Sequence, residues 1–208
     1  MRLEVSSHVP SSETWRLFFA VLIPDDVREG AVRLQRELAP ALRGMVKWVE
    51  PENLHVTLKF IGNVPAHVVG KIEEIGREAS AAAQGGQLVA RGIGAFPNLR
   101  RPRVIWVGLD GDVPALADVA GRLDQMLADA HIAQPESRPF AAHLTLGRIR
   151  RGARPPDLTS IVGRLGNAEL GPVPFGEFVL MRSHLRPSGP VYEVVARFAA
   201  TGKPQQGE

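Results

Sequence analysis

Two short segments with the same alternating pattern constrain this 208-residue chain more than any other feature. HVTLKF occupies residues 55–60, and HLTL recurs at residues 143–146, 88 positions after the first copy. Strict alternation of polar and apolar residues is typical of a half-buried β-strand. The first copy predicts three residues on a core face: Val56, Leu58 and Phe60. Its open face would then carry three others: His55, Thr57 and Lys59. Two copies indicate a site built from two halves.

The composition is that of an ordinary globular protein, with 44% hydrophobic and 23% charged residues. The absence of cysteine excludes disulfides, thiol nucleophiles and cysteine-ligated zinc or iron–sulfur sites, and fits a cytoplasmic location. The first 14 residues lack the apolar stretch of a secretory signal, and no run of about 18 apolar residues predicts a membrane span. We therefore expect no membrane partner. The net charge of +3 comes from an arginine-rich chain, and arginine suits phosphate contacts.

The order of predicted elements repeats along the chain. We expect residues 1–14 to be a flexible extension, residues 15–199 a single bilobal domain, and residues 200–208 a flexible tail. Residues 25–109 predict helix, motif strand, helix, strand, strand, and residues 112–199 predict the same order, with final strands near 173–185 and 190–199. This indicates an α+β fold duplicated about a pseudo-two-fold axis, with both motif strands at the centre. Chance recurrence of a common element order is the alternative interpretation.

Two histidines facing one cleft can divide acid–base work, because imidazole both gives and takes a proton near neutral pH. A threonine two positions along a strand shares the face of its histidine, about 6.5–7 Å away, and its hydroxyl can donate to a phosphate oxygen. No HExxH, acidic metal-ligand cluster or GxxxxGK[ST] loop is present. The residues therefore favour acid–base catalysis on an anionic phosphorus centre, with no metal or other cofactor.

Two arginine groups and two aromatic residues are candidates for substrate contacts. One basic group lies in a predicted loop and includes Arg101; another follows the second motif and includes Arg148 and Arg150. Both suit RNA phosphates, with solvated loop charge as the alternative interpretation. Phe96 and Trp48 suit stacking on a terminal base, with core packing as the alternative. A further group has weaker support as cleft lining: Ser183, Arg186 and Tyr192.

The paired motifs resemble the 2H phosphoesterase superfamily, in particular its RNA 2′,3′-cyclic phosphodiesterase branch, also called the LigT-like or 2′-5′ RNA ligase family. The similarity extends over residues 15–197, through RLFFAVLIP, VKWVEPENLHVTLKFIGNV, GIGAFPNLRRPRVIWVGL, RPFAAHLTLGRIR and SHLRPSGPVYEVV. One departure is Ala142, where many members have proline. The resemblance implies a bilobal fold with antiparallel sheets flanking a central cleft and helices on the outside.

The resemblance also implies residue roles. His55 would donate a proton to the leaving oxygen, His143 would accept a proton from water, and Thr57 and Thr145 would hold the nonbridging phosphate oxygens. The substrate would be RNA with a 2′,3′-cyclic phosphate end, the product a 2′-phosphate, and reversible 2′-5′ ligation would follow from microscopic reversibility.

The residues alone do not assign acid and base, because the motifs are nearly symmetrical. A nearby cation such as Arg148 would favour a neutral base at His143, but strand alternation places Arg148 on the opposite face unless Gly147 breaks the register. Two other functions stay open: a phosphodiesterase acting on small cyclic nucleotides or 2′-5′ oligoadenylates, and a non-catalytic RNA-binding module. We expect a monomer.

Overall fold

The computed structural model describes residues 13–187 and 189–201, so the expected terminal extension and tail lie almost wholly outside the described residues. The first half of the chain contains β1 (Thr14–Leu22), α1 (Asp25–Leu42), β2 (Val46–Trp48), η1 (Pro51–Asn53), β3 (His55–Pro65), η2 (Ala66–Val68), α2 (Val69–Ala82) and β4 (Gly86–Phe96). The second contains β5 (Val104–Gly111), α3 (Val113–Asp129), β6 (His143–Ile149), α4 (Thr159–Leu165), β7 (Glu169–Phe175), β8 (Glu177–Arg186) and β9 (Gly189–Ala199).

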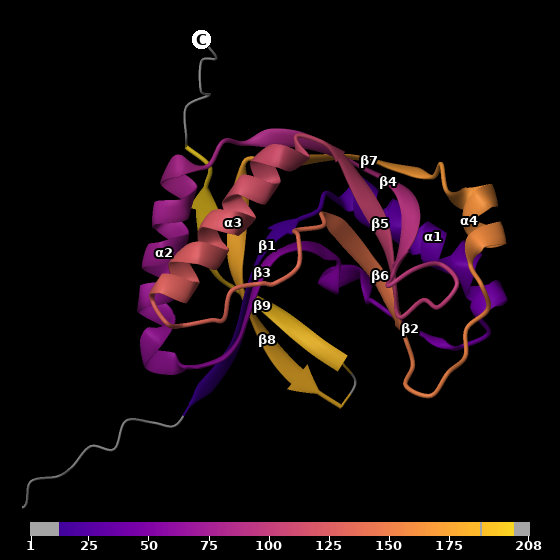
Figure 1. Ribbon diagram of the computed structural model, residues 1–208, viewed down its shortest axis with the longest axis horizontal. Coiled ribbons are helices and arrows are strands. Elements are labelled where there is room, and N and C mark those ends of the chain that lie inside the picture. The colour runs from indigo at the N-terminus through magenta and orange to yellow at the C-terminus, as the bar shows by residue number, and fades with distance from the viewer. Residues whose placement is uncertain (1–12, 188, 202–208) are drawn as a thin grey trace, which may run out of the picture.

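All nine described strands belong to one antiparallel sheet with the order β7-β4-β5-β6-β3-β1-β8-β9, and β2 pairs with β6. This order is symmetrical about the centre: β6 mirrors β3, β5 mirrors β1, and β4 mirrors β8. The sheet curls into a half-barrel whose two lobes meet between β3 and β6 (Figure 1). The expected bilobal α+β fold is confirmed, and the strands of its two lobes are continuous at the pair Val56–Leu144.

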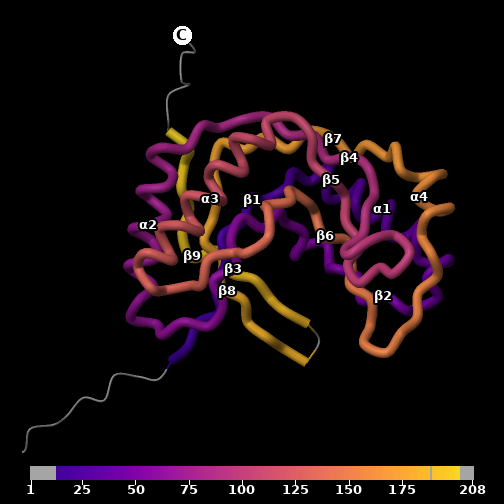
Figure 2. The backbone as a smooth tube through the Cα atoms, viewed as in Figure 1, coloured from indigo at the N-terminus to yellow at the C-terminus, as the bar shows by residue number. Residues whose placement is uncertain are grey.

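Helices cover the outer face of the curled sheet, as expected. The helices α2 and α3 pack against each other over one lobe, and α1 and α4 cover the other (Figure 1). One end of the β8–β9 hairpin packs against α2, and the hairpin extends from there away from α2 and α3 (Figure 2). No helix of the described residues is long and apolar enough to cross a membrane.

The nearly continuous apolar sequence of β1 reflects its place at the middle of its lobe, between β3 and β8. Leu17 and Phe19 point into the main core beneath the helices. Phe18 and Ala20 point to the opposite, concave face, where they form a small cluster with Met181 and Val179. Burial of both faces removes the alternation that usually marks a strand.

The prediction of one strand near residues 173–185 is wrong. Two strands, β7 and β8, occupy this region, and Gly176 separates them. The strand β7 pairs with β4 at one edge of the sheet, whereas β8 pairs with β1 in the other lobe. The backbone carbonyl of Gly176 accepts a hydrogen bond from the amide of Ala200, so the crossing point is tied to the end of β9. One apolar run therefore serves two lobes.

Candidate active site

The two motif strands meet at the centre of the sheet. Val56 pairs with Leu144 in antiparallel register. Continuing this register by one residue in each direction sets His55 across from Thr145 and Thr57 across from His143. A cleft of about 350 Å³ opens over this point. Residues lining it include Arg16, His55, Thr57, Thr145, Arg148 and Tyr192.

Each motif strand carries a β-bulge directly after its threonine. In β3 the register with β1 slips at Leu58, and in β6 the register with β5 slips at Leu146. A bulge inserts one extra residue and reverses which face the following side chains take. Phe60 and Arg148, each five residues after its motif histidine, therefore line the cleft.

The bulge in β3 overturns two expectations about that strand. Lys59, expected on the open face, is only 7% exposed, and Phe60, expected in the core, is 48% exposed. The Lys59 ammonium forms an ion pair with Asp124 of α3 and donates to the carbonyl oxygen of Gln134 at 2.8 Å. Lys59 thus ties β3 to the outer helix layer.

The bulge in β6 is held by a buried amide from α1. The Gln35 Nε2 group donates to the carbonyl oxygens of Val49 at 2.8 Å and Leu146 at 2.9 Å. The Val49 amide also donates to the Leu146 carbonyl at 2.9 Å. Gly147 follows, and a Cβ there would lie 2.5 Å from a methyl group of Val46, so only glycine admits β2 this closely.

Backbone carbonyls fix the tautomer of both histidines. His55 Nδ1 lies 2.7 Å from the Asn53 carbonyl oxygen, and His143 Nδ1 lies 2.7 Å from that of Ala141. A carbonyl oxygen only accepts, so each Nδ1 carries the hydrogen and each Nε2 is left for chemistry. The Thr57 hydroxyl lies 3.1 Å from His55 Nε2 and can donate to it.

Burial disfavours the charged form of both imidazoles. It lowers the pKa of His55 from 6.5 to about 4, against the opposing effect of the Asn53 carbonyl, and the charges of Arg148 and His143 lower it further. Burial also lowers the pKa of His143, with a contribution from Arg148. Arg148 therefore acts on both histidines, which strand alternation without the bulge did not predict.

Aromatic rings flank each histidine. The Phe18 ring centroid lies 4.9 Å from that of His55, and the Tyr192 ring meets His55 edge-on at 5.4 Å. In the other motif, Phe96 meets His143 edge-on at 5.0 Å. Burial raises the pKa of Tyr192. These aromatic rings supply the low-polarity surroundings that lower the pKa values of the two histidines.

The other predicted substrate contacts lie away from the cleft lining. Trp48 packs against the main core, and Arg150 donates to the Gly44 carbonyl at 3.0 Å. Arg101 is exposed in the β4–β5 loop, where its amide donates to Asn98 Oδ1 at 3.0 Å. Phe96 and Arg148 are the members of the predicted set that contact or influence the motif histidines.

Several residues of the cleft were missed from the sequence, among them Arg16, Asn53 and Phe60. Arg16 lies in the apolar run that predicted a central strand. It stands two positions before Phe18, so the two side chains share the face of β1 that lines the cleft, and this spacing was the signal in the sequence. Asn53 is buried, and its amide donates to the Pro190 carbonyl at 2.8 Å, so it joins His55 to the β8–β9 hairpin. No local signal in the sequence marks that contact.

Among residues 13–187 and 189–201, no cluster of three or more His, Asp or Glu side chains is placed to hold a metal ion.

Comparison with known proteins agrees with this architecture. The sequence model of the family described as LigT-like phosphoesterase matches the chain twice, at residues 21–106 and 107–192. The chain is 36% identical to the RNA 2′,3′-cyclic phosphodiesterase of Methanothermobacter thermautotrophicus over 177 residues, which cover 85% of this chain and 94% of that protein. It is also 36% identical to the protein of the same name from Archaeoglobus fulgidus, over 86% of this chain and 96% of that one.

Solved structures show the same fold. The crystal structure of Escherichia coli LigT complexed with 3′-AMP superimposes with a TM-score of 0.71 and 26% identity, covering 91% of this chain and 99% of that one. The crystal structure of TT0787 from Thermus thermophilus gives a TM-score of 0.75 and 29% identity, over 90% and 99% of the two chains. Each of the two family matches contains one motif strand, β3 in the first and β6 in the second. The chain belongs to the LigT-like phosphoesterase family.

Proposed function

We propose that the protein hydrolyses 2′,3′-cyclic phosphate ends of RNA to 2′-phosphomonoesters, with His55 and His143 as the acid–base pair. The observation that carries this proposal is the pairing of the two motif strands at Val56 and Leu144. It sets each motif histidine across from the threonine of the other motif, beside a cleft that His55, Thr57, Thr145 and Arg148 line. The name RNA 2′,3′-cyclic phosphodiesterase, borne by relatives at 36% identity, supports the same substrate.

In the proposed reaction, His143 Nε2 takes a proton from water as the water oxygen attacks phosphorus. The bond from phosphorus to the ribose 3′ oxygen breaks, and that oxygen takes a proton from His55 Nε2. Thr57 and Thr145 donate to the nonbridging oxygens, and Arg148 stabilises their charge. If the 5′ hydroxyl of a second RNA takes the place of water, His143 takes its proton, the bond to the 3′ oxygen breaks as before, and the product is a 2′-5′ bond.

To act as the acid, His55 must become protonated when the substrate binds. A pKa of about 4 leaves His55 neutral in the free protein at pH 7. An anionic phosphate beside the imidazole favours its charged form and raises that pKa. In the free protein, burial favours neutral His55, which is the form that a base requires. The opposite assignment, with His55 as base and His143 as acid, is therefore tested by a separate experiment on the direction of proton transfer.

A small cyclic nucleotide is the second candidate substrate. The cleft of about 350 Å³ is at the small end of ligand sites, and E. coli LigT has been crystallised with 3′-AMP. Turnover of a cyclic mononucleotide and of an oligonucleotide with a cyclic end, compared at two salt concentrations, separates the candidates, because only a polyanion shows a steep salt dependence.

The test of the proposed function uses an RNA oligonucleotide with a 2′,3′-cyclic phosphate end, incubated in EDTA between pH 5 and 8. No step of the scheme requires a metal ion, so we expect conversion to a terminal 2′-phosphate. An unchanged cyclic end throughout this pH range would contradict the proposal, and a 3′-phosphate would contradict the assignment of the leaving oxygen. The cytoplasmic location and monomeric state stay predictions.

A further inference from the structure

A second groove of about 510 Å³ runs on from the central cleft over β1, β3 and β8. It shares three lining residues with the cleft: Arg16, Ser183 and Leu185. The two hollows therefore lie next to each other. The central cleft, at the small end of ligand sites, has room for a single nucleotide, so a longer strand must leave it through an adjoining opening.

The groove is lined by three arginines: Arg16, Arg182 and Arg186. Arg182 is held by Glu13 at 2.7 Å and lies over the Trp15 ring. Within the described part of the chain, neither Arg16 nor Arg186 forms an ion pair with a carboxylate. His184 also lines the groove, and its ring is hydrogen-bonded to Glu193 at 2.8 Å. The groove thus presents an excess of positive charge beside the site that would hold the cyclic phosphate.

Apolar surface is exposed where the groove joins the cleft. Phe60 is 48% exposed and Leu185 is 74% exposed, although both lie on a face otherwise lined by polar groups. The Arg16 guanidinium lies 4.6 Å from the centre of the Phe60 ring. An exposed ring beside an arginine is the arrangement that single-stranded nucleic acids use, with the base stacked and the phosphate paired.

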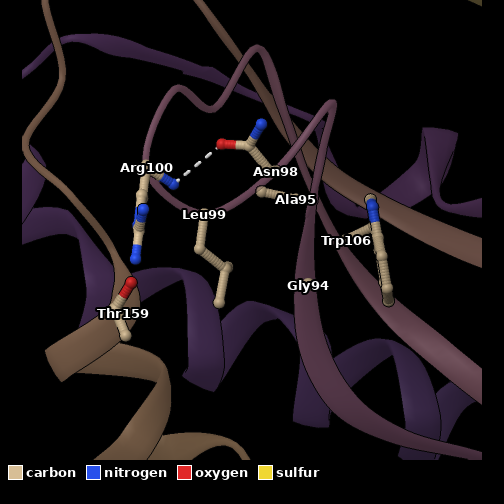
Figure 3. A pocket seen from close by; sticks show the side chains of 7 residues that line it. All are labelled: Gly94, Ala95, Asn98, Leu99, Arg100, Trp106 and Thr159. Atoms are coloured by element: carbon tan, nitrogen blue, oxygen red, sulfur yellow. Dashed lines mark hydrogen bonds between the residues drawn. The ribbon is translucent and has the colours of Figure 1, made fainter.

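The other large hollow near the histidines is a weaker match for a strand. It lies between the β4–β5 loop and α4, and Arg100 is its one arginine among the residues drawn there (Figure 3). Its wall also includes the apolar side chains of Trp106, Leu99 and Ala95 (Figure 3). Charge therefore distinguishes the two hollows.

We propose that the groove of Arg16, Arg182 and Arg186 binds the RNA strand on the 5′ side of the cyclic end. A 2′,3′-cyclic phosphate closes the 3′ terminus, so every further nucleotide is attached through the 5′ oxygen. The backbone phosphates of these nucleotides would pair with the arginines, and the base next to the terminal one would stack on Phe60. The inference rests on the function proposed above and adds a subsite that selects oligonucleotides over mononucleotides.

The test compares kcat/KM for a 2′,3′-cyclic mononucleotide and for a six-nucleotide RNA with the same end, at about 50 and 200 mM salt. We expect the wild type to prefer the oligonucleotide at low salt. Arg186→Ala should raise KM for the oligonucleotide about three- to tenfold and make its salt slope shallower by about 0.7, the value for one phosphate contact on a single strand. Its kcat/KM for the mononucleotide should not change.

Two matched variants make the result specific. Arg100→Ala removes the arginine of the hollow between the β4–β5 loop and α4, and Arg122→Ala removes an exposed arginine of α3 that pairs with Asp118. Both should retain the wild-type preference for the oligonucleotide. A loss of that preference in Arg100→Ala but not in Arg186→Ala would overturn the proposal, as would an equal fall for both substrates in Arg186→Ala.

Failure of the proposed function would be seen separately, as no turnover of either substrate by the wild type. The groove is then tested by fluorescence anisotropy with a labelled six-nucleotide RNA ending in a 2′-phosphate. Binding that is about three- to tenfold weaker in Arg186→Ala than in Arg122→Ala would support the groove. Equal binding by the two variants would overturn it.

Discussion

Val56 of β3 pairs with Leu144 of β6, and this pair joins the two lobes of the sheet. Because the strands are antiparallel, the neighbouring histidine of each motif faces the threonine of the other. The proposed catalytic groups are therefore positioned by the backbone at the centre of the fold rather than by a loop. A site on paired strands keeps its geometry within narrow limits, which acid–base catalysis needs.

The direction of proton transfer can be read with a substrate whose bridging 3′ oxygen is replaced by sulfur. A thiolate leaves without a proton, because thiols have a pKa of about 8.5. If His55 is the donor, His55→Ala should recover most of its rate on the sulfur substrate, while His143→Ala stays slow. Recovery of His143→Ala instead would assign the roles the other way.

Removing the Arg148 charge should change both histidines at once. Arg148 lowers the pKa of His55 and of His143, so in Arg148→Gln both pKa values should rise. The titration of the two imidazoles by NMR measures this directly. The rate should also fall about 10²-fold or more, because the phosphate loses a charge-assisted contact. Arg150→Gln is the matched control, and equal effects in both variants would refute a specific role for Arg148.

Gln35 should position Arg148 through the bulge that it supports. Gln35→Met leaves two buried carbonyl oxygens with one donor fewer and should cost about 1–2 kcal/mol of unfolding free energy in urea. If the bulge relaxes, Arg148 leaves the cleft, and the pKa values of His55 and His143 rise as in Arg148→Gln. Gln125→Met, on the exposed face of α3, should change neither property. Lost stability with unchanged histidine titration would show that Gln35 only supports folding.

The pKa of His55 also links stability to pH. The unfolded chain binds a proton near pH 6.5 and the folded protein near pH 4, so between these values the unfolded state holds more protons. Stability from this group is complete above pH 6.5 and is lost as pH falls toward 4. The fall in unfolding free energy from about pH 7 to pH 4.5 should be about 2 kcal/mol larger in the wild type than in His55→Gln. Equal falls in both proteins would contradict the low pKa.

The sequence was sufficient for the paired strands but not for the bulges. Alternation and repetition predicted that His55, Thr57, His143 and Thr145 share one face, because backbone geometry alone sets that period. The sequence did not reveal the bulges, because leucine at positions 58 and 146 fits the alternating pattern with or without a bulge. Phe60 and Arg148 were therefore placed on the wrong face, and Gly147 was the one visible sign.

Contacts between distant segments could not be predicted from the sequence, for a different reason. The hydrogen bond from Asn53 to Pro190 and the bond from Gln35 to Leu146 join residues that lie 137 and 111 positions apart. Their existence depends on how the two lobes pack, and a single sequence holds no local pattern for it. The division of one apolar run into β7 and β8 likewise depends on which lobe each strand joins.

The most direct test of the paired-histidine account is the single-turnover rate of the wild type, His55→Ala and His143→Ala on an RNA oligonucleotide with a 2′,3′-cyclic phosphate end. Each variant should lose about 10²- to 10⁴-fold in rate while binding the RNA as tightly as the wild type. A wild-type rate in either variant, or an inactive wild type that binds RNA, would contradict catalysis by these two residues.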